Sequence, residues 1–245
     1  MAITIDQLLK MGFSDEIQEV PRRAVVSLSG KEKTGKTRWA LTAPDPIVFF
    51  NIDIGTEGVI EKFQTGKGVP KKQILIYNVS VPKEATQNVY ENTWNDFKAK
   101  AKTSYGLKGG TVIFDTGTEA YELNRLARFG KLTQVMPHHY AEVNNEWRDL
   151  IRTAYDSDMN TVLVHKLKPR YVNNTRTSEY DVAGFGETAY LVQANVRTFR
   201  EDNEDQKMPT FGVTIQDCRQ NPKINGETLS GPISTFEFLL GMIHG

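Results

Sequence analysis

The chain has 245 residues, and its 30 basic and 30 acidic side chains give a formal net charge of zero. This balance excludes a protein coated in positive charge for duplex DNA. It leaves room for a local basic groove, because nucleic-acid binding depends on where the charge lies. Hydrophobic residues make up 39% of the sequence, which is enough for a buried core, and the length suits one α/β domain with additions.

Cys218 is the only cysteine in the sequence. A single cysteine excludes an intramolecular disulfide and a cysteine-based zinc site, so a reducing cytoplasm is expected. No apolar run approaches the length that crosses a membrane. Residues 1–7 lack the basic start and the apolar core of a signal peptide. We therefore expect a cytoplasmic protein with no membrane partner.

The first segment, residues 1–23, precedes the main domain, which is expected over residues 24–245. A short helix is expected in the first segment, with Ile5, Leu8 and Leu9 on one face. Two roles remain open for this segment. It either caps an edge of the sheet or docks on a neighbouring subunit.

A glycine-rich motif organises the rest of the chain. Residues 24–29 form an apolar run typical of a buried strand. Residues 30–37, Gly-Lys-Glu-Lys-Thr-Gly-Lys-Thr, then fit the P-loop pattern G-x-x-x-x-G-K-[ST] at every fixed position. Gly30 and Gly35 carry no Cβ, so the backbone can wrap closely around phosphates. The alternative, a Gly- and Lys-rich surface turn, does not account for the strand before the motif and the helix-compatible run after it.

This motif predicts a site for ATP and Mg²⁺. The N–H groups of the loop and of the following helix N-terminus face a bound anion. Lys36 is expected to reach the β- and γ-phosphates, and the Thr37 hydroxyl to hold Mg²⁺. The residues expected to bind the nucleotide are Gly30, Lys31, Glu32, Lys33, Thr34, Gly35, Lys36, Thr37 and Arg38.

Carboxylates follow two further apolar strands. The strand at residues 47–52 leads to Asp53 and, four residues on, Glu57, and the strand at residues 111–115 ends in Asp115. Ligands bind outside the carboxyl ends of the strands in an open parallel sheet. Asp53 or Glu57 is therefore expected to polarise the attacking water, and Asp115 to support Mg²⁺ as a Walker B aspartate. A turn aspartate and a helix-capping glutamate are the alternative for the first pair.

Another buried strand, residues 161–165, ends in His165, which is expected beside the γ-phosphate as its sensor. A hairpin or mobile loop is expected over residues 171–181, with basic residues interleaved with a tyrosine. Such a mixture suits single-stranded nucleic acid, because it neutralises phosphates and offers a face on which bases stack. A solvated basic hairpin is the alternative.

The remaining periodic segments predict helices around the sheet and an antiparallel hairpin that extends it near the C-terminus. Helices are expected over residues 84–103, 118–130, 140–157 and 233–243, and the hairpin strands over residues 192–200 and 211–219.

This order of features resembles the core of RecA-like recombinases. The segment Asp53-Ile-Gly-Thr-Glu-Gly58 and the run Leu163-Val-His-Lys166 resemble the phage members of that class, the Sak-type single-strand annealing ATPases. The resemblance covers residues 24–218. It implies an α/β fold with a RecA-like P-loop NTPase core, in which helices flank a mostly parallel sheet. The family usually has a glutamine sensor where His165 and Lys166 stand, so the coupling to the γ-phosphate is expected to differ.

The resemblance also implies site residues. Residues 129–140 look like a first DNA-binding loop and residues 166–181 like a second. Arg200 and Lys207 fall where the family places basic residues that act across a subunit interface, with plain surface charges as the alternative. The residues expected in catalysis are Lys36, Asp53, Glu57, Asp115 and His165, and those expected to bind DNA are Arg128, Lys131, His138, His139, Lys166, Lys168, Arg170, Tyr171 and Arg176.

The expected function is that of an ATP-dependent, single-stranded DNA-binding recombinase or annealing protein of phage type. It would assemble with itself into filaments or rings in the host cytoplasm, and a single-strand-binding protein is a further candidate partner. The alternative is a RecA-core ATPase that acts on a protein, such as a helicase loader or a switch, with hydrolysis indifferent to DNA. A small-molecule kinase ranks last, because the sequence offers no arginine-rich lid.

Overall fold

An eight-stranded sheet organises the protein. The computed structural model describes residues 3–16, 21–53, 55–80, 85–132, 134–202 and 208–245. The strand order is β10-β9-β8-β1-β5-β4-β2-β3, and β6 and β7 form a separate two-stranded sheet. The strands are β1 Val25–Gly30, β2 Ile47–Asn51, β3 Ile74–Asn78, β4 Thr111–Asp115, β5 Asn160–His165, β6 Leu167–Val172, β7 Thr175–Val182, β8 Ala194–Glu201, β9 Thr210–Cys218 and β10 Thr228–Ser230.

The strands from β8 to β3 in this order are all parallel, whereas β9 and β10 add to the β8 edge in antiparallel fashion. Every residue of β1, β4 and β5 is buried. This agrees with their continuous apolar runs, because a parallel strand covered on both faces has no polar side to present. The prediction of an α/β fold with a mostly parallel sheet and an antiparallel extension is confirmed.

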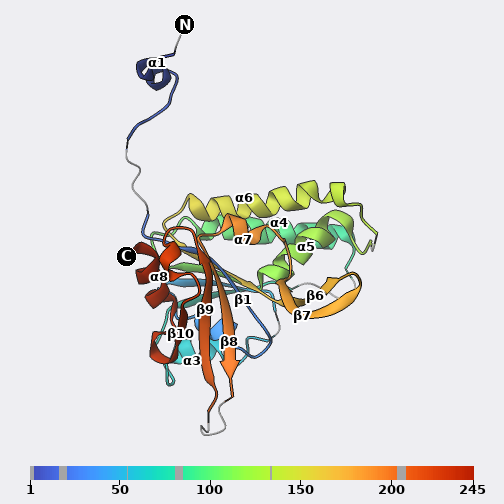
Figure 1. Ribbon diagram of the computed structural model, residues 1–245. Coiled ribbons are helices and arrows are strands. Elements are labelled where there is room, and N and C mark those ends of the chain that lie inside the picture. The colour runs from blue at the N-terminus through green and yellow to red at the C-terminus, as the bar shows by residue number, and fades with distance from the viewer. Residues whose placement is uncertain (1–2, 17–20, 54, 81–84, 133, 203–207) are drawn as a thin grey trace.

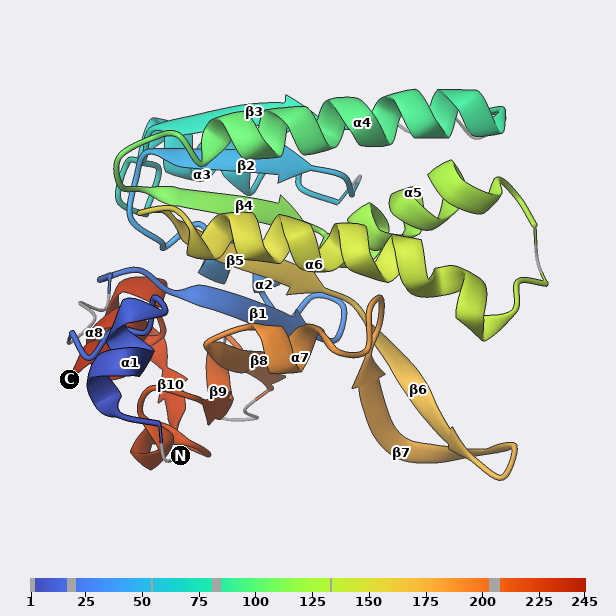
Figure 2. The same cartoon turned by 90° about the horizontal axis from the view of Figure 1, so that it is seen from above.

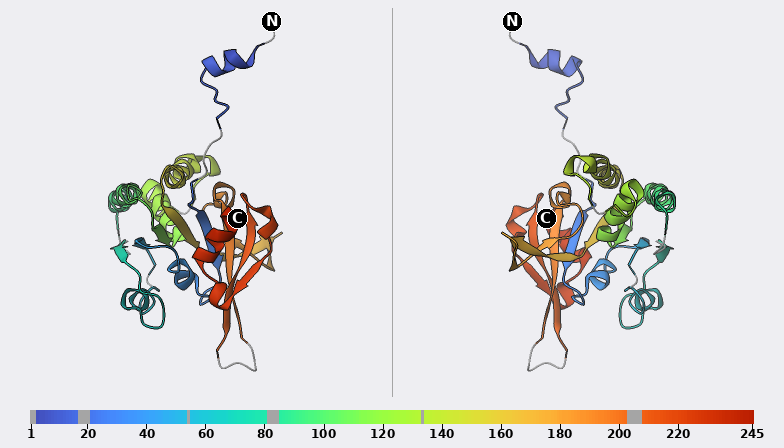
Figure 3. Two further views of the ribbon diagram at one scale, coloured as in Figure 1. Left: turned by 90° about the vertical axis from the view of Figure 1, so that its left-hand side faces the viewer. Right: turned by 90° about the vertical axis from the view of Figure 1, so that its right-hand side faces the viewer.

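Helices cover both faces of this sheet, as Figure 1 and the two side views in Figure 3 show. One core cluster joins α2, α3 and α8 to one face, and a second joins α4, α5 and α6 to the other. Neighbouring strand residues divide between the clusters, with Phe49 in the first and Phe50 in the second. The helices are α1 Ile5–Lys10, α2 Lys36–Ala40, α3 Ile60–Thr65, α4 Gln87–Ser104, α5 Gly117–Phe129, α6 Ala141–Tyr155, α7 Thr188–Leu191 and α8 Phe236–His244.

The predicted helix over residues 84–103 corresponds to α4. Trp94 and Phe97 point into the core, as expected, but Val89 is 38% exposed and Tyr90 is buried in its place. Tyr90 lies four residues before Trp94 and therefore shares its face of the helix, whereas Val89 does not.

The N-terminal segment stands away from the rest of the molecule (Figures 1 and 3). Thr4 and Gln7 form a capping box at the start of α1, which is the predicted short helix. Apolar side chains of this segment face solvent, including Ile5 at 73% and Met11 at 69% exposure. Both roles expected for this segment, capping a sheet edge and docking on a neighbouring subunit, stay predictions.

Two hairpins project from the sheet. The strands β8 and β9 extend past the body at one side (Figure 1), and β6 and β7 extend at the end where β1, β4 and β5 terminate (Figure 2). Asn173 and Asn174 form the tip of the second hairpin with φ of 50° and 60°. Asparagine tolerates this left-handed backbone, which a two-residue type I′ turn requires at both positions.

No helix within the described parts of the chain has the length and apolar character needed to cross a membrane.

Candidate functional site

The P-loop joins β1 to α2 and requires glycine at two positions for different reasons. Gly35 has a φ of +87°, which side-chain-bearing residues rarely adopt. Gly30 instead faces a close neighbour, since a Cβ at this position would lie 1.9 Å from Thr198 Oγ1 on β8. Lys33 adopts a φ of 59° without being glycine, so the surrounding contacts must hold the loop in shape.

Lys36 opens α2 and lies over the loop. Its Nζ donates hydrogen bonds to the carbonyl oxygens of Gly30 at 3.0 Å and Lys31 at 2.7 Å. Burial lowers the pKa of Lys36, and the nearby Asp115 opposes this effect. The ammonium group therefore belongs to a partly desolvated site, where it attracts a phosphate more strongly than it would in water.

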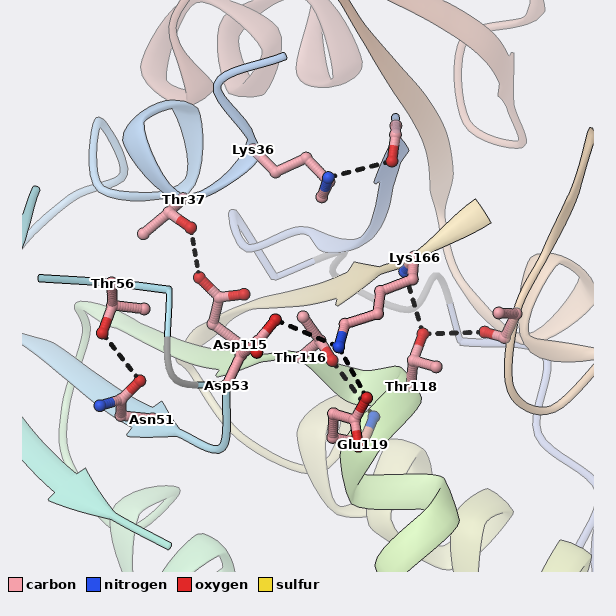
Figure 4. Close-up of polar contacts among 12 residues, drawn as sticks. Lys36, Thr37, Asn51, Asp53, Thr56, Asp115, Thr116, Thr118, Glu119 and Lys166 are labelled. Atoms are coloured by element: carbon pink, nitrogen blue, oxygen red, sulfur yellow. Dashed lines mark hydrogen bonds and ion pairs between the residues drawn. The ribbon is translucent and has the colours of Figure 1, made fainter. Parts of the chain in front are cut away.

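Thr37 and Asp115 meet across the sheet edge. Thr37 Oγ1 donates a hydrogen bond of 2.6 Å to Asp115 Oδ2 (Figure 4). Asp115 is 3% exposed, and burial, with a further contribution from Asp53, raises its pKa to about 6. A cation beside this carboxylate would favour its ionised form. The structure thus brings together the two residues that the sequence assigned to Mg²⁺.

Asp53 follows β2 and lies in the same site (Figure 4). Lys166, between β5 and β6, forms ion pairs with Asp53 at 3.2 Å and with Glu119 on α5 at 2.7 Å. Burial by itself lowers the pKa of Lys166, but the two carboxylates outweigh burial and leave the pKa raised. Lys166 therefore stays a cation within reach of the proposed phosphate region.

Two predicted catalytic residues lie outside this cluster. His165 is completely buried, and burial lowers its pKa to about 4. Its ring lies near Gly117 and Gly184 and does not line the cavity described below, where we expect the γ-phosphate. Successive strand residues face opposite sides, and it is Lys166 that reaches the cavity. Glu57 is exposed and absent from the cavity wall, which leaves Asp53 as the better-placed carboxylate.

A cavity of about 480 Å³ unites these groups. Of the residues expected to bind the nucleotide, all but Thr34 line it, together with Asp53, Asp115 and Lys166. This lining fits a nucleoside triphosphate with Mg²⁺. The backbone N–H groups of the P-loop and Lys36 suit the phosphates, and the Thr37 hydroxyl with the Asp115 carboxylate suits the metal ion. Thr37 and Asp115 would hold the metal. Among the described residues, His, Cys, Asp and Glu side chains form no cluster of three that would make a separate metal centre.

Sequence reasoning missed Glu119 and Tyr180. Glu119 follows Thr116 by three residues, and Thr116 Oγ1 accepts a hydrogen bond from the Glu119 backbone N–H at 3.2 Å. This Thr-x-x-Glu pattern after a buried strand is a signal that a helix starts at the site. Tyr180 on β7 lines the cavity, and Lys31 Nζ lies 4.7 Å from its ring centre. No local sequence pattern predicts the contact between Lys31 and Tyr180, because these residues are far apart in the chain.

Of the residues expected to bind DNA in this region, Arg128 lies in the last turn of α5. The first predicted loop, residues 129–140, follows from the end of that helix to the start of α6. Arg128 forms an ion pair with Glu142. Lys131, His138 and His139 are exposed, and the two histidine rings lie 4.0 Å apart between centroids. The described part of this loop lies at the same end of the molecule as the β6–β7 hairpin (Figure 2).

The second predicted loop is the β6–β7 hairpin. Tyr171 is 61% exposed near its tip and pairs across the strands with Arg176. Lys168 is exposed, while Arg170 forms ion pairs with Glu179 and Asp181. Part of the basic charge of the hairpin is therefore neutralised within it. Lys166 lies in the cavity instead of on the hairpin surface.

Of the two residues expected to act across an interface, the structure describes Arg200, which lies on β8 of the β8–β9 hairpin. Arg200 forms a 2.7 Å ion pair with Asp202 at the outer end of β8. Lys207 lies outside the described residues.

The parallel sheet, the P-loop after β1 and the pair of Thr37 on α2 with Asp115 at the end of β4 define a nucleotide-binding P-loop ATPase domain. A family model described as an AAA domain matches residues 22–190, and the chain belongs to this family. No curated protein matches the sequence. Among solved structures, the chain is similar to a KaiC-like protein from the hyperthermophilic archaeon Pyrococcus horikoshii OT3, with 13% identity, 84% of each chain covered and a TM-score of 0.47.

Proposed function

We propose that this ATPase binds single-stranded DNA and acts in recombination or strand annealing, as a phage-type protein that assembles with itself. The β6–β7 hairpin carries this proposal. It begins directly after Lys166, which pairs with Asp53 in the nucleotide cavity, and Leu167 and Tyr180 at its base line that cavity. Its tip stands in solvent at the other end (Figure 2). A single element therefore links the nucleotide to an exposed surface.

The outer part of this hairpin has groups that suit a single strand. Tyr171 presents its ring to solvent beside Arg176, its cross-strand partner, and Lys168 is exposed on the same strand as Tyr171. A stacked base on an exposed aromatic ring contributes about 1–3 kcal/mol, and neighbouring cations neutralise the phosphates. Binding of this kind tolerates any sequence, because every base has a face to stack.

Hydrolysis would depend on three groups around the cavity. Lys36 would neutralise the phosphates, and Thr37 and Asp115 would hold a Mg²⁺ ion that supplies further positive charge there. Asp53 is the candidate for orienting the attacking water. Lys166 now pairs with Asp53 at 3.2 Å, and a terminal phosphate would compete with Asp53 for the same ammonium group. We infer that Lys166, in place of His165, senses the γ-phosphate.

Self-assembly is supported by the N-terminal segment. The apolar side chains Ile3, Ile5, Met11 and Phe13 are each more than 60% exposed, on a segment that stands away from its own body. Exposed apolar groups gathered on one segment are typical of a surface that docks on another molecule. Docking on a neighbouring subunit, the second role expected for this segment, is therefore the one we propose.

The test compares ATP hydrolysis with and without an oligothymidine strand. We expect DNA to raise the rate several-fold, and Lys36→Ala to abolish hydrolysis. Tyr171→Ala should weaken DNA binding by about tenfold or more, because one stacking face is lost. Tyr190→Ala is the matched control, since Tyr190 is 78% exposed but lies on α7 instead of the hairpin. DNA affinity should also fall with added salt.

A protein-directed ATPase is the second candidate, and the ion pairs of Arg170 and Arg128 with nearby carboxylates favour it. These pairs reduce the positive charge available to phosphates. If the ATP hydrolysis rate is the same with and without DNA while Lys36→Ala still abolishes it, the single-stranded DNA proposal is refuted. The protein-directed function then takes its place.

A further inference from the structure

Thr198 on β8 lies against the P-loop from the side of the sheet. The register of β1 and β8 sets Thr198 beside Gly30, and its Oγ1 lies 2.7 Å from Thr34 Oγ1 in the loop. Both threonines are buried, at 4% and 9% exposure. The close approach depends on Gly30, because a Cβ there would collide with the Thr198 hydroxyl.

The direction of this hydrogen bond follows from proton counting. Thr34 Oγ1 donates to the Lys31 carbonyl oxygen at 2.7 Å. Two hydroxyl protons serve three contacts, and the two shortest, both 2.7 Å, are satisfied when Thr34 donates to Lys31 and Thr198 donates to Thr34. The other acceptor near Thr198, the Ser29 carbonyl oxygen, is more distant at 3.3 Å. A relay therefore runs from Thr198 through Thr34 to the Lys31 carbonyl.

The end of this relay is part of the phosphate-binding region. The Lys31 carbonyl oxygen also accepts a hydrogen bond from Lys36 Nζ at 2.7 Å. Lys33, within the same turn, adopts a left-handed backbone that costs free energy in a residue with a long side chain, so contacts around the loop help to maintain it. Phe211 on β9 also lies near the loop, since a Cβ built on Gly35 would stand 3.5 Å from its ring.

We propose that Thr198 is a positioning residue of the nucleotide site, which holds the P-loop in its phosphate-binding shape through Thr34. This inference rests on the proposed nucleotide binding. Neither threonine lines the cavity, so the effect is indirect. A loop that is already ordered loses less conformational entropy when the ligand binds. Without the Thr198 hydroxyl, part of the binding free energy would be spent on ordering residues 31–34.

The experiment measures the Kd for a fluorescent ATP analogue with Mg²⁺. Thr198→Val keeps the shape of the side chain and removes the hydroxyl, and we expect it to weaken binding about 3- to 10-fold, the range of one net hydrogen bond. Thr198→Ser should stay within about twofold of the wild type, because it keeps the donor. Thr228→Val is the matched control, since it removes a threonine–threonine contact of 3.3 Å with Thr214 in the same sheet, on the β9–β10 pair.

A second measurement separates positioning from simple stability. Thermal unfolding is followed for every variant, and Thr198→Ala replaces Thr198→Val if the valine variant fails to fold. The double variant Thr34→Val with Thr198→Val should bind no more weakly than Thr34→Val alone, because both changes break the same relay.

Equal affinity of the wild type and Thr198→Val would overturn the inference, as would equal weakening by Thr228→Val. If the wild-type chain binds no ATP analogue, the proposed function itself is refuted and the role of Thr198 with it. A selective loss in Thr198→Val that Thr198→Ser restores would support the inference.

Discussion

Replacing Asp115 by asparagine should make the protein more stable while it destroys hydrolysis. Burial is the main reason that the Asp115 pKa stands at about 6 instead of 3.8. A shift of this size costs the folded state about 3 kcal/mol once the group is ionised in both states. Asparagine carries no charge to bury, and its side-chain oxygen can still accept the Thr37 hydrogen bond.

The sign of this effect sets its pH dependence. The folded pKa is raised, so the cost is complete above pH 6 and vanishes below the unfolded value of 3.8. In the absence of nucleotide and metal, the Asp115→Asn variant should exceed the wild type by up to about 3 kcal/mol at pH 8, and by about half of that at pH 5. For a chain of this size, the larger difference corresponds to a rise of roughly 6–12 °C in Tm.

Urea unfolding followed by circular dichroism at both pH values measures these differences, and ATP hydrolysis is assayed in parallel. The variant should lose hydrolysis by at least about 100-fold, because the Mg²⁺ position loses its charged ligand. If Asp115→Asn is less stable than the wild type at pH 8, or if the difference is the same at both pH values, the cost of burying this carboxylate has been misjudged.

Two further substitutions test the site from other directions. Gly30→Ala should weaken ATP binding at least about tenfold and destabilise the fold by about 1–3 kcal/mol, because its Cβ would lie 1.9 Å from Thr198 Oγ1. Nucleotide titration measures the first effect and thermal unfolding the second. A variant that binds ATP as tightly as the wild type would refute the steric reasoning. Lys166→Met should lower the hydrolysis rate at least about tenfold. Its Tm should change little, because the side chains of the Lys166 ion pairs are about 40% exposed and screened by water. An unchanged hydrolysis rate would exclude Lys166 as the γ-phosphate sensor.

The fold could be predicted because its signals are local and repeated. Each buried strand is a continuous apolar run, and the P-loop fixes which strand leads into the phosphate region. The meeting of Thr37 and Asp115 follows from one general rule, since the carboxyl ends of parallel strands share one edge of the sheet. The buried face of a helix was less predictable, as Val89 and Tyr90 of α4 show, because an apolar stripe can include either of two neighbouring residues and still fit the same pattern.

The finer parts of the site depend on information that a local pattern lacks. Choosing between His165 and Lys166 requires knowing which side of a strand end faces the cavity, and the apolar run before them is buried on both faces. The contact between Thr34 and Thr198 depends on the register of β1 against β8, whose residues are far apart in the sequence. Glu119 is the exception among these residues, because a local pattern, the Thr-x-x-Glu helix cap, does mark its position. That pattern predicts a helix start and says nothing of the ion pair with Lys166.

The short connection between β5 and β6 has a mechanical consequence. His165 ends one strand and Leu167 begins the next, so Lys166 is the sole residue between β5 and β6. A strand of eight residues such as β7 spans about 26 Å. Treated as a stiff arm of that length, the hairpin would move its tip by roughly 4–5 Å for a 10° rotation at its base. The pivot of this arm is Lys166, the residue that pairs with Asp53. A rotation at Lys166 that is too small to disturb the sheet would therefore move the exposed Tyr171, near the hairpin tip, by several times the displacement at the base.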